Sequence, residues 1–546
     1  MRGAQAIANI LKSEGVEQVF LFPLTPILEA IAAAGIRPIV TRQERVAGNM
    51  ADGYSRVTMD DRIGVASVQD SAGAENAFAG LAQAFTDSSR ILLLPGHPGR
   101  AKVGVSPTFD SVENYHRATK YATRLATPES ISEQFRRAYT ALRSGRPRPA
   151  LVEIPNDIAR GEVPEPSYTP PKSVKSAPDP AAVREAVKLL LAAERPMLRA
   201  GQGILYAHAS AELAEVAELL AAPVATTLLG KSAFNETHPL ALGSCGLSES
   251  DMIPDYQGRA DVVFGIGTSL TQTVFATPLP VGKTIVHSTN DPSDINKDIG
   301  CEVPVIGDAK LVLAAMAEEI RSQTDGKGRA GLDAVKADVK SMVDAWKARW
   351  APKLGDADSP INPYRVIGEF MNVVNPDDAI VTHESGGSRD MLVPIYPSTT
   401  PRSYLGWGHS TQLGFSVGAA MGAKLAAPDK LVVNFTGDTA FGMVGMDIET
   451  AARENIPILT IMFNNSVMGN YDNYIPTATE KFNTRTTSGN YSEVAKALGV
   501  YGERVTDPNE VRAAIERGIQ QTKDGRPAFL EFITREERDI AYRPRK

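Results

Sequence analysis

The chain of 546 residues is long enough for about three or four domains. Its composition, with 43% hydrophobic and 22% charged residues, is ordinary for a globular protein with a buried core. A formal net charge of −7 is small for this length and argues against a nucleic-acid partner. The two cysteines exclude a disulfide framework and a cysteine-based zinc site.

The first residues predict an amphipathic helix, with Ile7, Ile10 and Leu11 at helical spacing, and they do not resemble a signal peptide. The apolar stretch that follows is interrupted by Pro23 and Pro26, so we expect no membrane span and no membrane partner. These features predict a cytoplasmic protein.

Residues 1–165 alternate short apolar strands and helices, which is the pattern of a doubly wound parallel sheet. The expected strands are residues 18–22, 38–41, 63–68, 91–94 and 150–154. A stretch rich in proline and without periodicity follows, and residues 166–180 are therefore expected to form a linker.

Two further α/β units complete the chain. Residues 181–345 form the middle unit. Its expected strands include residues 262–265 and 284–287. After a charged helix expected from residue 332 to about 350, residues 360–534 form the third unit and residues 535–546 a charged tail. The predicted fold class is α/β, with three doubly wound parallel-sheet domains.

Residues 431–465 carry the strongest pattern in the chain, two apolar strands separated by a helical segment. The strands are expected at residues 431–435 and 458–463, with one helix between them. Strands joined in this way are parallel, so both of their carboxyl ends lie at one edge of the sheet. That edge is where open α/β sheets bind ligands.

Polar side chains follow both strands at this edge. Asp438 comes directly after Gly437, and Asn464 and Asn465 end the second strand. Carboxylate and amide oxygens suit Mg²⁺, which is usually bound together with substrate phosphates. Taken alone, the first half of this pattern, Gly437 and Asp438, could instead be a helix cap. The second half, Asn464 and Asn465, could be a polar turn after a strand.

Together the two halves resemble the diphosphate-binding signature of thiamine diphosphate (ThDP) enzymes. Asn465 follows Asp438 by 27 residues, which is the spacing of acetolactate-synthase-like members. The resemblance implies ThDP and Mg²⁺ as cofactors, with Asp438, Asn465 and the backbone carbonyl of Val467 as metal ligands. It also implies cofactor contacts at Gly437, Thr439, Ala440 and Gly469.

The segment TRQERVAGNMADGYSR, residues 41–56, resembles the activating helix of the same family. By this resemblance, Glu44 is the carboxylate that bonds the pyrimidine N1′ of the cofactor, so that the cofactor's own 4′-amino group can act as a base. Such a carboxylate is expected in an apolar cleft. Without the resemblance, Glu44 would be read as a first-turn glutamate that faces a helix dipole.

Two more segments resemble cofactor-binding parts of the family. Ser388, with the arginine after it, lies where relatives bond the diphosphate. Residues 408–414 (GHSTQLG) resemble GGLGTMG, which implies that the carbonyl of Thr411 accepts from the 4′-amino group and that Leu413 wedges between the cofactor rings. His409 replaces a glycine there, and is either a proton shuttle or a structural histidine.

The loops at the substrate pocket depart from the family. Its YPGG appears as residues 22–25 (FPLT), and its SGPGATN appears as residues 70–76 (DSAGAEN). Larger side chains in place of glycine imply a pocket that differs from that of a standard acetolactate synthase. His97 is either a pocket acid or a turn histidine, and Asp110 stands where glutamine is usual.

The residues after Asn465 resemble an active-site lid. By this resemblance, Asn470 and Tyr474 are expected to face the substrate. The chain stays polar and rich in threonine up to Gly489, which is consistent with a mobile cover.

In the middle unit, the pair Gly201 and Gly203 is weak evidence for a nucleotide. Relatives that bind FAD carry an arginine where this chain has Thr268. We therefore expect a structural middle domain without FAD, and a nucleotide-binding domain remains the alternative.

The resemblance spans nearly the whole chain and implies the domain order pyrimidine-binding, middle, diphosphate-binding. Family members hold ThDP between subunits, so it implies a homodimer or homotetramer with active sites at the interface. The leading function is a decarboxylase/carboligase with a 2-oxo acid as its small-molecule carbonyl substrate. The alternatives are a C–C lyase acting on a 2-hydroxyacyl-CoA, oxalyl-CoA or 1,2-dione, and a silent paralogue that binds ThDP without turnover.

Overall fold

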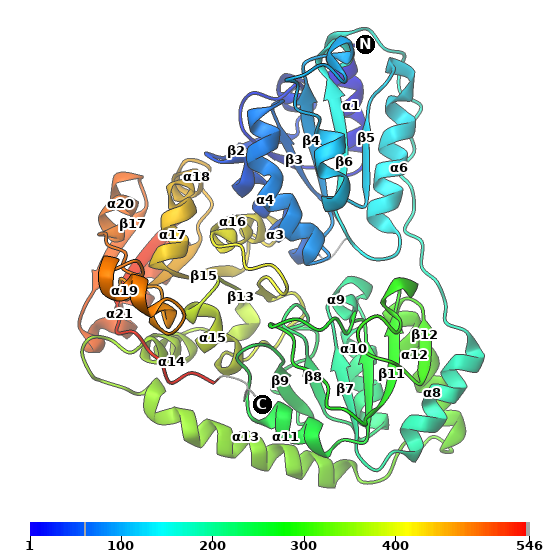
Figure 1. The fold of residues 1–546 in the computed structure, drawn as a ribbon, viewed down its shortest axis with the longest axis vertical. Coiled ribbons are helices and arrows are strands. Elements are labelled where there is room, and N and C mark those ends of the chain that lie inside the picture. The colour runs from blue at the N-terminus through cyan, green and yellow to red at the C-terminus, as the bar shows by residue number, and fades with distance from the viewer. Residues whose placement is uncertain (59–61, 542–546) are drawn as a thin grey trace.

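Three parallel sheets of six strands each follow one another along the chain. The computed structural model describes residues 1–58 and 62–541, so part of the expected tail, residues 542–546, lies outside the described residues. Helices cover the sheets, and the three α/β units meet near the centre of the molecule (Figure 1). The predicted fold class, α/β with three doubly wound parallel sheets, is confirmed.

The first sheet has the strand order β2-β1-β3-β4-β6-β5. Its strands are β1 (Gln18–Leu21), β2 (Arg37–Val40), β3 (Gly64–Val68), β4 (Ile91–His97), β5 (Tyr121–Arg124) and β6 (Ala150–Pro155). Its helices are α1 (Gly3–Ser13), α2 (Leu28–Ala33), α3 (Glu44–Val57), α4 (Ala72–Thr86), α5 (Ser111–Tyr115), α6 (Ile131–Arg143) and α7 (Asn156–Arg160). All five expected strands occur. The strand β5 was not expected, because it lies at the sheet edge and its side chains are only half-buried.

The second sheet has the order β12-β11-β10-β7-β8-β9. Its strands are β7 (Pro196–Ala200), β8 (Val224–Thr226), β9 (Ala241–Ser244), β10 (Val262–Ile266), β11 (Thr284–Thr289) and β12 (Val303–Ile306). Its helices are α8 (Pro180–Ala192), α9 (Gly203–Ala207), α10 (Ser210–Leu219), α11 (Met252–Arg259) and α12 (Ala309–Gln323). The helix α13 (Leu332–Leu354) then leads to the third unit, where Trp350 packs against Tyr364 with ring centroids 5.1 Å apart.

The third sheet has the order β14-β13-β15-β16-β18-β17. Its strands are β13 (Ala379–His383), β14 (Tyr404–Leu405), β15 (Leu431–Gly437), β16 (Leu459–Asn464), β17 (Tyr501–Val505) and β18 (Ala528–Ile533). Its helices are α14 (Pro363–Val373), α15 (Gly387–Ile395), α16 (Phe415–Ala426), α17 (Asp438–Val444), α18 (Ile448–Arg453), α19 (Pro476–Phe482), α20 (Tyr491–Ala497) and α21 (Val511–Lys523).

The first and third units share one apolar core, because α3 packs directly against α16. The two backbones approach closely at Gly53 and Gly422. A Cβ atom on Gly53 would lie 2.2 Å from the carbonyl oxygen of Ala419, and one on Gly422 would lie 2.0 Å from that of Met50. A side chain at either glycine would therefore force the helices apart.

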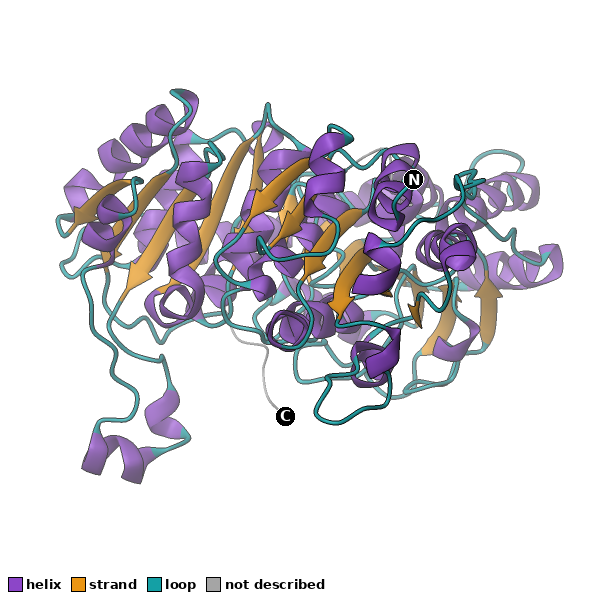
Figure 2. Ribbon diagram, turned by 90° about the horizontal axis from the view of Figure 1, so that it is seen from above, coloured by secondary structure: helices purple, strands orange, loops and turns teal. Residues whose placement is uncertain are grey.

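A segment around α19 stands away from the body of the molecule. Figure 2 shows its short helices projecting from the third unit at one end. Among the described residues, no helix is both long and apolar enough to cross a membrane.

Candidate active site

The strands β15 and β16 bring the predicted metal ligands to one edge of the third sheet. They run parallel, and Gly437 pairs with Phe463 in register. Asp438 and the two asparagines therefore leave neighbouring strands at nearly the same level. This is the arrangement that the sequence predicts for a dication and a diphosphate.

Asp438 is held in a defined orientation. Its carboxylate accepts hydrogen bonds from the backbone N–H of Thr439 (2.7 Å) and from the hydroxyl of Thr487 (3.0 Å). Burial raises the pKa of Asp438, and these hydrogen bonds, with the backbone of Ser466, oppose the shift. A buried carboxylate of this kind favours a nearby cation.

The two asparagines play different parts. The side chain of Asn464 is buried and donates to Glu531 (2.7 Å), so it stabilises the sheet. Asn465 is only half-buried, and its side-chain oxygen accepts from the backbone N–H of Val467 (3.1 Å). The second asparagine is thus the one available to a ligand at this edge.

The residues present fit a metal held together with a diphosphate. Among the described residues, no cluster of three or more His, Cys, Asp or Glu side chains could hold a metal ion, so a metal here would need further ligands from a bound molecule. One carboxylate and one amide leave several positions for phosphate oxygens, as Mg²⁺ prefers. A Cβ on Gly437 would meet no atom within 4 Å, so the space beside this backbone is open. Thr439 is half-buried at the same point, and Ala440 is buried.

The prediction of a single helix after Asp438 is wrong. The segment breaks into α17, a short 3₁₀ turn (Gly445–Asp447) and α18. Gly445 lies against the ring of Phe441, where a Cβ would come within 2.5 Å of it. The break turns Asp447 inward, where it is fully buried, and leaves Met446 47% exposed.

The loop that carries Thr411 and Leu413 is anchored at both ends by buried carboxylates from other elements. At its start, Asp87, which ends α4, accepts from the backbone N–H groups of Gly408 (3.1 Å) and His409 (2.9 Å). Burial raises the pKa of Asp87 to about 6, while the nearby guanidinium of Arg56 opposes the shift.

At the other end of the loop, Glu384 is the anchor. Its carboxylate accepts from the backbone N–H of Gly414 (3.0 Å) and from the N–H (3.1 Å) and hydroxyl (2.9 Å) of Ser416. Burial raises the pKa of Glu384, and these hydrogen bonds oppose the rise. Between the anchors, Thr411 is exposed and Leu413 is half-buried, so both are accessible to a ligand.

The other predicted residues of this domain face elsewhere. Ser388 is buried and donates to the backbone carbonyl of Glu384 (3.2 Å). Arg389 is buried as well and stacks on Trp407 at 4.7 Å from its ring centroid. His409 lines a cavity on the side of the middle domain. Burial there lowers its pKa, helped by the charges of nearby basic side chains.

Glu44 opens α3 and is 7% exposed. Its carboxylate accepts from the side-chain amide of Asn76 (3.3 Å) and lies beside Gly73. Both residues belong to α4, the helix that follows β3 in the same domain. The carboxylate is therefore held at the carboxyl edge of the first sheet, as the resemblance implies for the cofactor-activating acid.

A second cavity, of about 480 Å³, opens at this same edge of the first sheet. Its wall includes Glu75, His97 and Asp110. Asp110 caps α5 through the backbone N–H of Glu113 (3.0 Å) and pairs with Arg124 (2.7 Å), so its carboxylate is already engaged. His97 accepts the backbone N–H of Gly99 on its Nδ1 (3.2 Å), which leaves the proton of the neutral ring on Nε2.

The expected lid begins at Val467, whose backbone pairs with Thr486 in an isolated antiparallel bridge. Gly469 is exposed and Asn470 is half-buried. The charged tail contacts this segment: Glu536 accepts from the backbone N–H of Asn470 (2.9 Å) and pairs with Arg485 (2.9 Å). These contacts lower the pKa of Glu536 to about 2, against the opposing effect of its partial burial.

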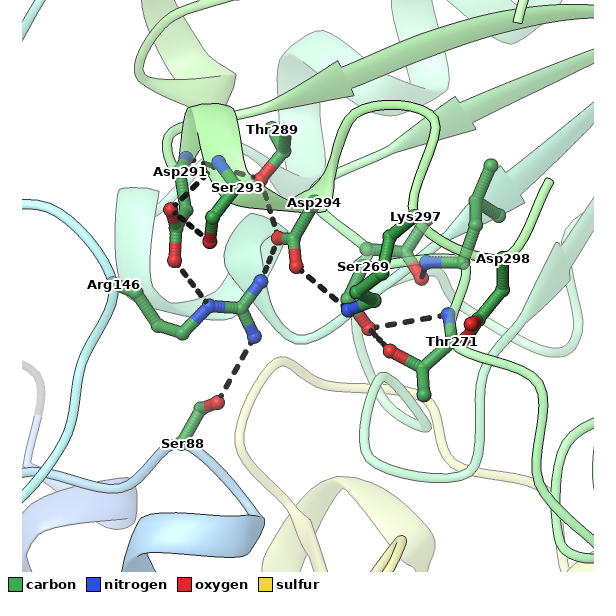
Figure 3. Close-up of polar contacts among 12 residues, drawn as sticks. Ser88, Arg146, Ser269, Thr271, Thr289, Asp291, Ser293, Asp294, Lys297 and Asp298 are labelled. Atoms are coloured by element: carbon green, nitrogen blue, oxygen red, sulfur yellow. Dashed lines mark hydrogen bonds and ion pairs between the residues drawn. The ribbon is translucent and has the colours of Figure 1, made fainter. Parts of the chain in front are cut away.

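The middle domain contains a cavity of about 190 Å³ at its junction with the other two domains. Arg146, from the first domain, reaches across to it. Its guanidinium bonds Asp291 (3.0 Å) and Ser88 (3.2 Å) and forms an ion pair with Asp294, which also pairs with Lys297 (2.9 Å) (Figure 3). These contacts tie the first domain to the carboxyl end of β11.

We expect purified protein to show no flavin absorbance in the visible range. Ligand pockets usually measure about 300–1,000 Å³. The cavity at the middle domain, of about 190 Å³, is smaller than this range. Absorbance spectra of the native and denatured protein test the expectation, and flavin bands released on denaturation would contradict it.

The fold and the site together define a three-domain α/β protein in which Asp438 and Asn465 meet at one edge of the third sheet. Family models of thiamine pyrophosphate enzymes match the chain in order: the N-terminal TPP binding domain over residues 1–120, the central domain over residues 183–316, and the C-terminal TPP binding domain over residues 385–532.

Similar proteins match nearly the full length. A probable acetolactate synthase large subunit of Methanocaldococcus jannaschii is 30% identical over 98% of this chain and 92% of its own length. The acetolactate synthase isozyme 3 large subunit of Escherichia coli K12 is 28% identical over 97% of this chain and 94% of its own length. The chain therefore belongs to the thiamine pyrophosphate enzymes of the acetolactate-synthase-like type, which form or break carbon–carbon bonds.

Proposed function

We propose that this enzyme is a ThDP- and Mg²⁺-dependent decarboxylase/carboligase that acts on a 2-oxo acid. The observation that carries the proposal is the placement of Asp438 and Asn465 at one sheet edge, beside open backbone at Gly437. The relatives, which are acetolactate synthase large subunits, support the same class of reaction.

Each residue has a distinct part in the proposed site. Asp438, Asn465 and the carbonyl of Val467 would hold Mg²⁺ at the site of the diphosphate. Glu44 holds a proton at the pyrimidine N1′, while Thr411 and Leu413 orient the two rings. When bound, the cofactor supplies a nucleophilic carbon and an electron sink. The cover from Val467 to Gly489, whose helix α19 stands away from the body of the molecule in this structure, would exclude water from the reacting groups when it closes.

The proposed assembly is a homodimer or homotetramer with its active sites between subunits. Large apolar side chains are exposed on the segments that flank the site residues. Leu24 is 64% exposed, Phe78 41%, and Met443 and Met446 47% each. A second copy of the chain that covers these side chains would bring Glu44 of one subunit to the diphosphate site of the other. The proposed location is the cytoplasm.

We expect CO2 release from at least one 2-oxo acid, and only when ThDP and Mg²⁺ are both present. The measurement is CO2 release with product mass spectrometry over a panel of 2-oxo acids, each with and without the cofactors. The product mass separates release of an aldehyde from ligation to a second carbonyl. If no acid releases CO2, the proposal fails, and cleavage of a 1,2-dione or a 2-hydroxyacyl thioester is the reaction to test next.

A further inference from the structure

We propose that Asp447 is a positioning residue for Glu44. It fixes the start of α3 from the third domain of the same chain. The proposal rests on the proposed role of Glu44 as the cofactor-activating acid.

Asp447 contacts the backbone immediately before Glu44. It is fully buried, and its Oδ1 accepts from the backbone N–H of Arg42 at 2.8 Å. The hydroxyl of Thr450 donates to the same oxygen at 3.3 Å and so holds the carboxylate in place. Arg42 lies two residues before Glu44, the first residue of α3.

The cap residue does not fix the start of α3 through its own side chain. A side chain at the cap position usually accepts from one of the first N–H groups of a helix. In α3 the cap residue is Gln43, which makes no such hydrogen bond. The side-chain amide of Gln43 instead points to the third domain and donates to the carbonyl of Met443 (3.5 Å).

Other contacts from α18 fix the strand that leads to this point. Arg453 donates to the carbonyl of Val40 (2.6 Å), and Arg37 donates to the carbonyl of Glu454 (2.8 Å). These contacts involve side chains that are partly exposed to water. Asp447 is the buried contact of this group, and it acts nearest to Glu44.

The position of Glu44 depends strongly on this backbone. Within its own domain, its carboxylate has the side-chain amide of Asn76 as a hydrogen-bond partner at 3.3 Å, which is long for a hydrogen bond to a carboxylate. An acid that holds a proton must stay within hydrogen-bond reach of its target, and a displacement of about 1 Å can cost about 10²-fold in rate. A small shift of the backbone at Arg42 would therefore move the carboxylate of Glu44.

Asp447→Asn is the variant that tests the proposal. It keeps the volume of the side chain but removes its charge, and thereby weakens the hydrogen bond to Arg42. We expect amide hydrogen exchange in residues 40–46 of the cofactor-free protein to become faster. With ThDP and Mg²⁺ bound, we expect exchange of the proton at the cofactor's C2 to slow by about 10-fold or more. The affinity for ThDP should change by no more than about 2-fold, because the residues that bind the diphosphate are untouched.

Glu449→Gln is the matched control. It removes two partly exposed ion pairs, with the side chains of Arg42 (3.2 Å) and Arg453 (3.0 Å), and leaves the hydrogen bond of Arg453 to the carbonyl of Val40 in place. We expect both exchange rates to stay as in the unaltered enzyme, since exposed ion pairs contribute little. If Asp447→Asn does not fold, Thr450→Val supplies a second test, because it removes the hydroxyl that holds the Asp447 carboxylate.

Two results would overturn the proposal. One is an Asp447→Asn enzyme that exchanges the C2 proton at the unaltered rate. The other is a loss of activity explained entirely by weaker ThDP binding or lower thermal stability, which would make Asp447 merely structural. Failure of the proposed function is distinguishable, because Glu44→Gln would then leave C2 exchange unaffected in the otherwise unaltered enzyme.

Discussion

Glu44→Gln is expected to lower turnover by about 10²-fold or more, because positioned acid–base groups contribute about 10²–10⁴-fold to rates. The glutamine side chain keeps the size and one acceptor oxygen of glutamate, so the cavity around the 7%-exposed residue stays filled. It has no carboxylate to share a proton with the pyrimidine N1′. ThDP should remain bound, since the diphosphate is held by the other domain. Steady-state rates and calorimetric ThDP binding test both parts.

Glu29→Gln is the matched control for this prediction. Glu29 is an exposed residue on α2 of the same domain. It makes the same chemical change without touching the activating carboxylate, and we expect ThDP to bind as before. Turnover by Glu44→Gln at the unaltered rate would remove Glu44 from the mechanism.

Asp438→Ala is expected to abolish metal-dependent retention of ThDP. The alanine removes the buried carboxylate that directly follows β15, and with it the main charge that attracts a dication. We expect the variant to lose ThDP on gel filtration whether or not Mg²⁺ is present. The unaltered enzyme should retain ThDP with Mg²⁺ and lose it after chelation.

Asp429→Ala serves as the comparison, since this aspartate is exposed in the same domain just before β15. Its removal should leave retention unchanged. Equal, metal-dependent retention of ThDP by Asp438→Ala and by the unaltered enzyme would refute the assignment of the metal site. Circular dichroism of the apoproteins shows whether each variant is folded.

The sequence predicted strands that are mostly buried on both faces, because these appear as short apolar runs. The strand β15, for example, extends two residues past the predicted end at Phe435. The edge strands β5, β9, β12, β14 and β17 were not predicted. The break after α17 was not predictable from periodicity alone. It arises where Gly445 meets the ring of Phe441, a contact between side chain and backbone that no hydrophobic pattern records.

The site residues were predicted from local sequence patterns. The side chains that hold them in place by hydrogen bonds lie in distant parts of the chain. Asp87 bonds the backbone of His409 across 322 residues of sequence. Glu384 lies four residues before Ser388, which the sequence assigned to the diphosphate, and in the structure it fixes the loop of Leu413. An acidic residue at the end of a strand or helix is consistent with a role in fixing a loop. The sequence does not show which backbone N–H groups it bonds, because these come from a distant segment.

The glycine contact between α3 and α16 has a consequence for how the chain is made. The two helices belong to opposite ends of the sequence, yet they bury one another's apolar faces in a common core. During synthesis the N-terminal third emerges first and must wait, with the face of Met50 uncovered, until the C-terminal third arrives. One core of the middle domain lies within a single continuous stretch and has no such delay, although the opposite face of this domain shares a core with the third domain. The order in which the domains complete their cores therefore differs from the order of their synthesis. The uncovered face of α3 in the nascent protein is where a chaperone would be needed.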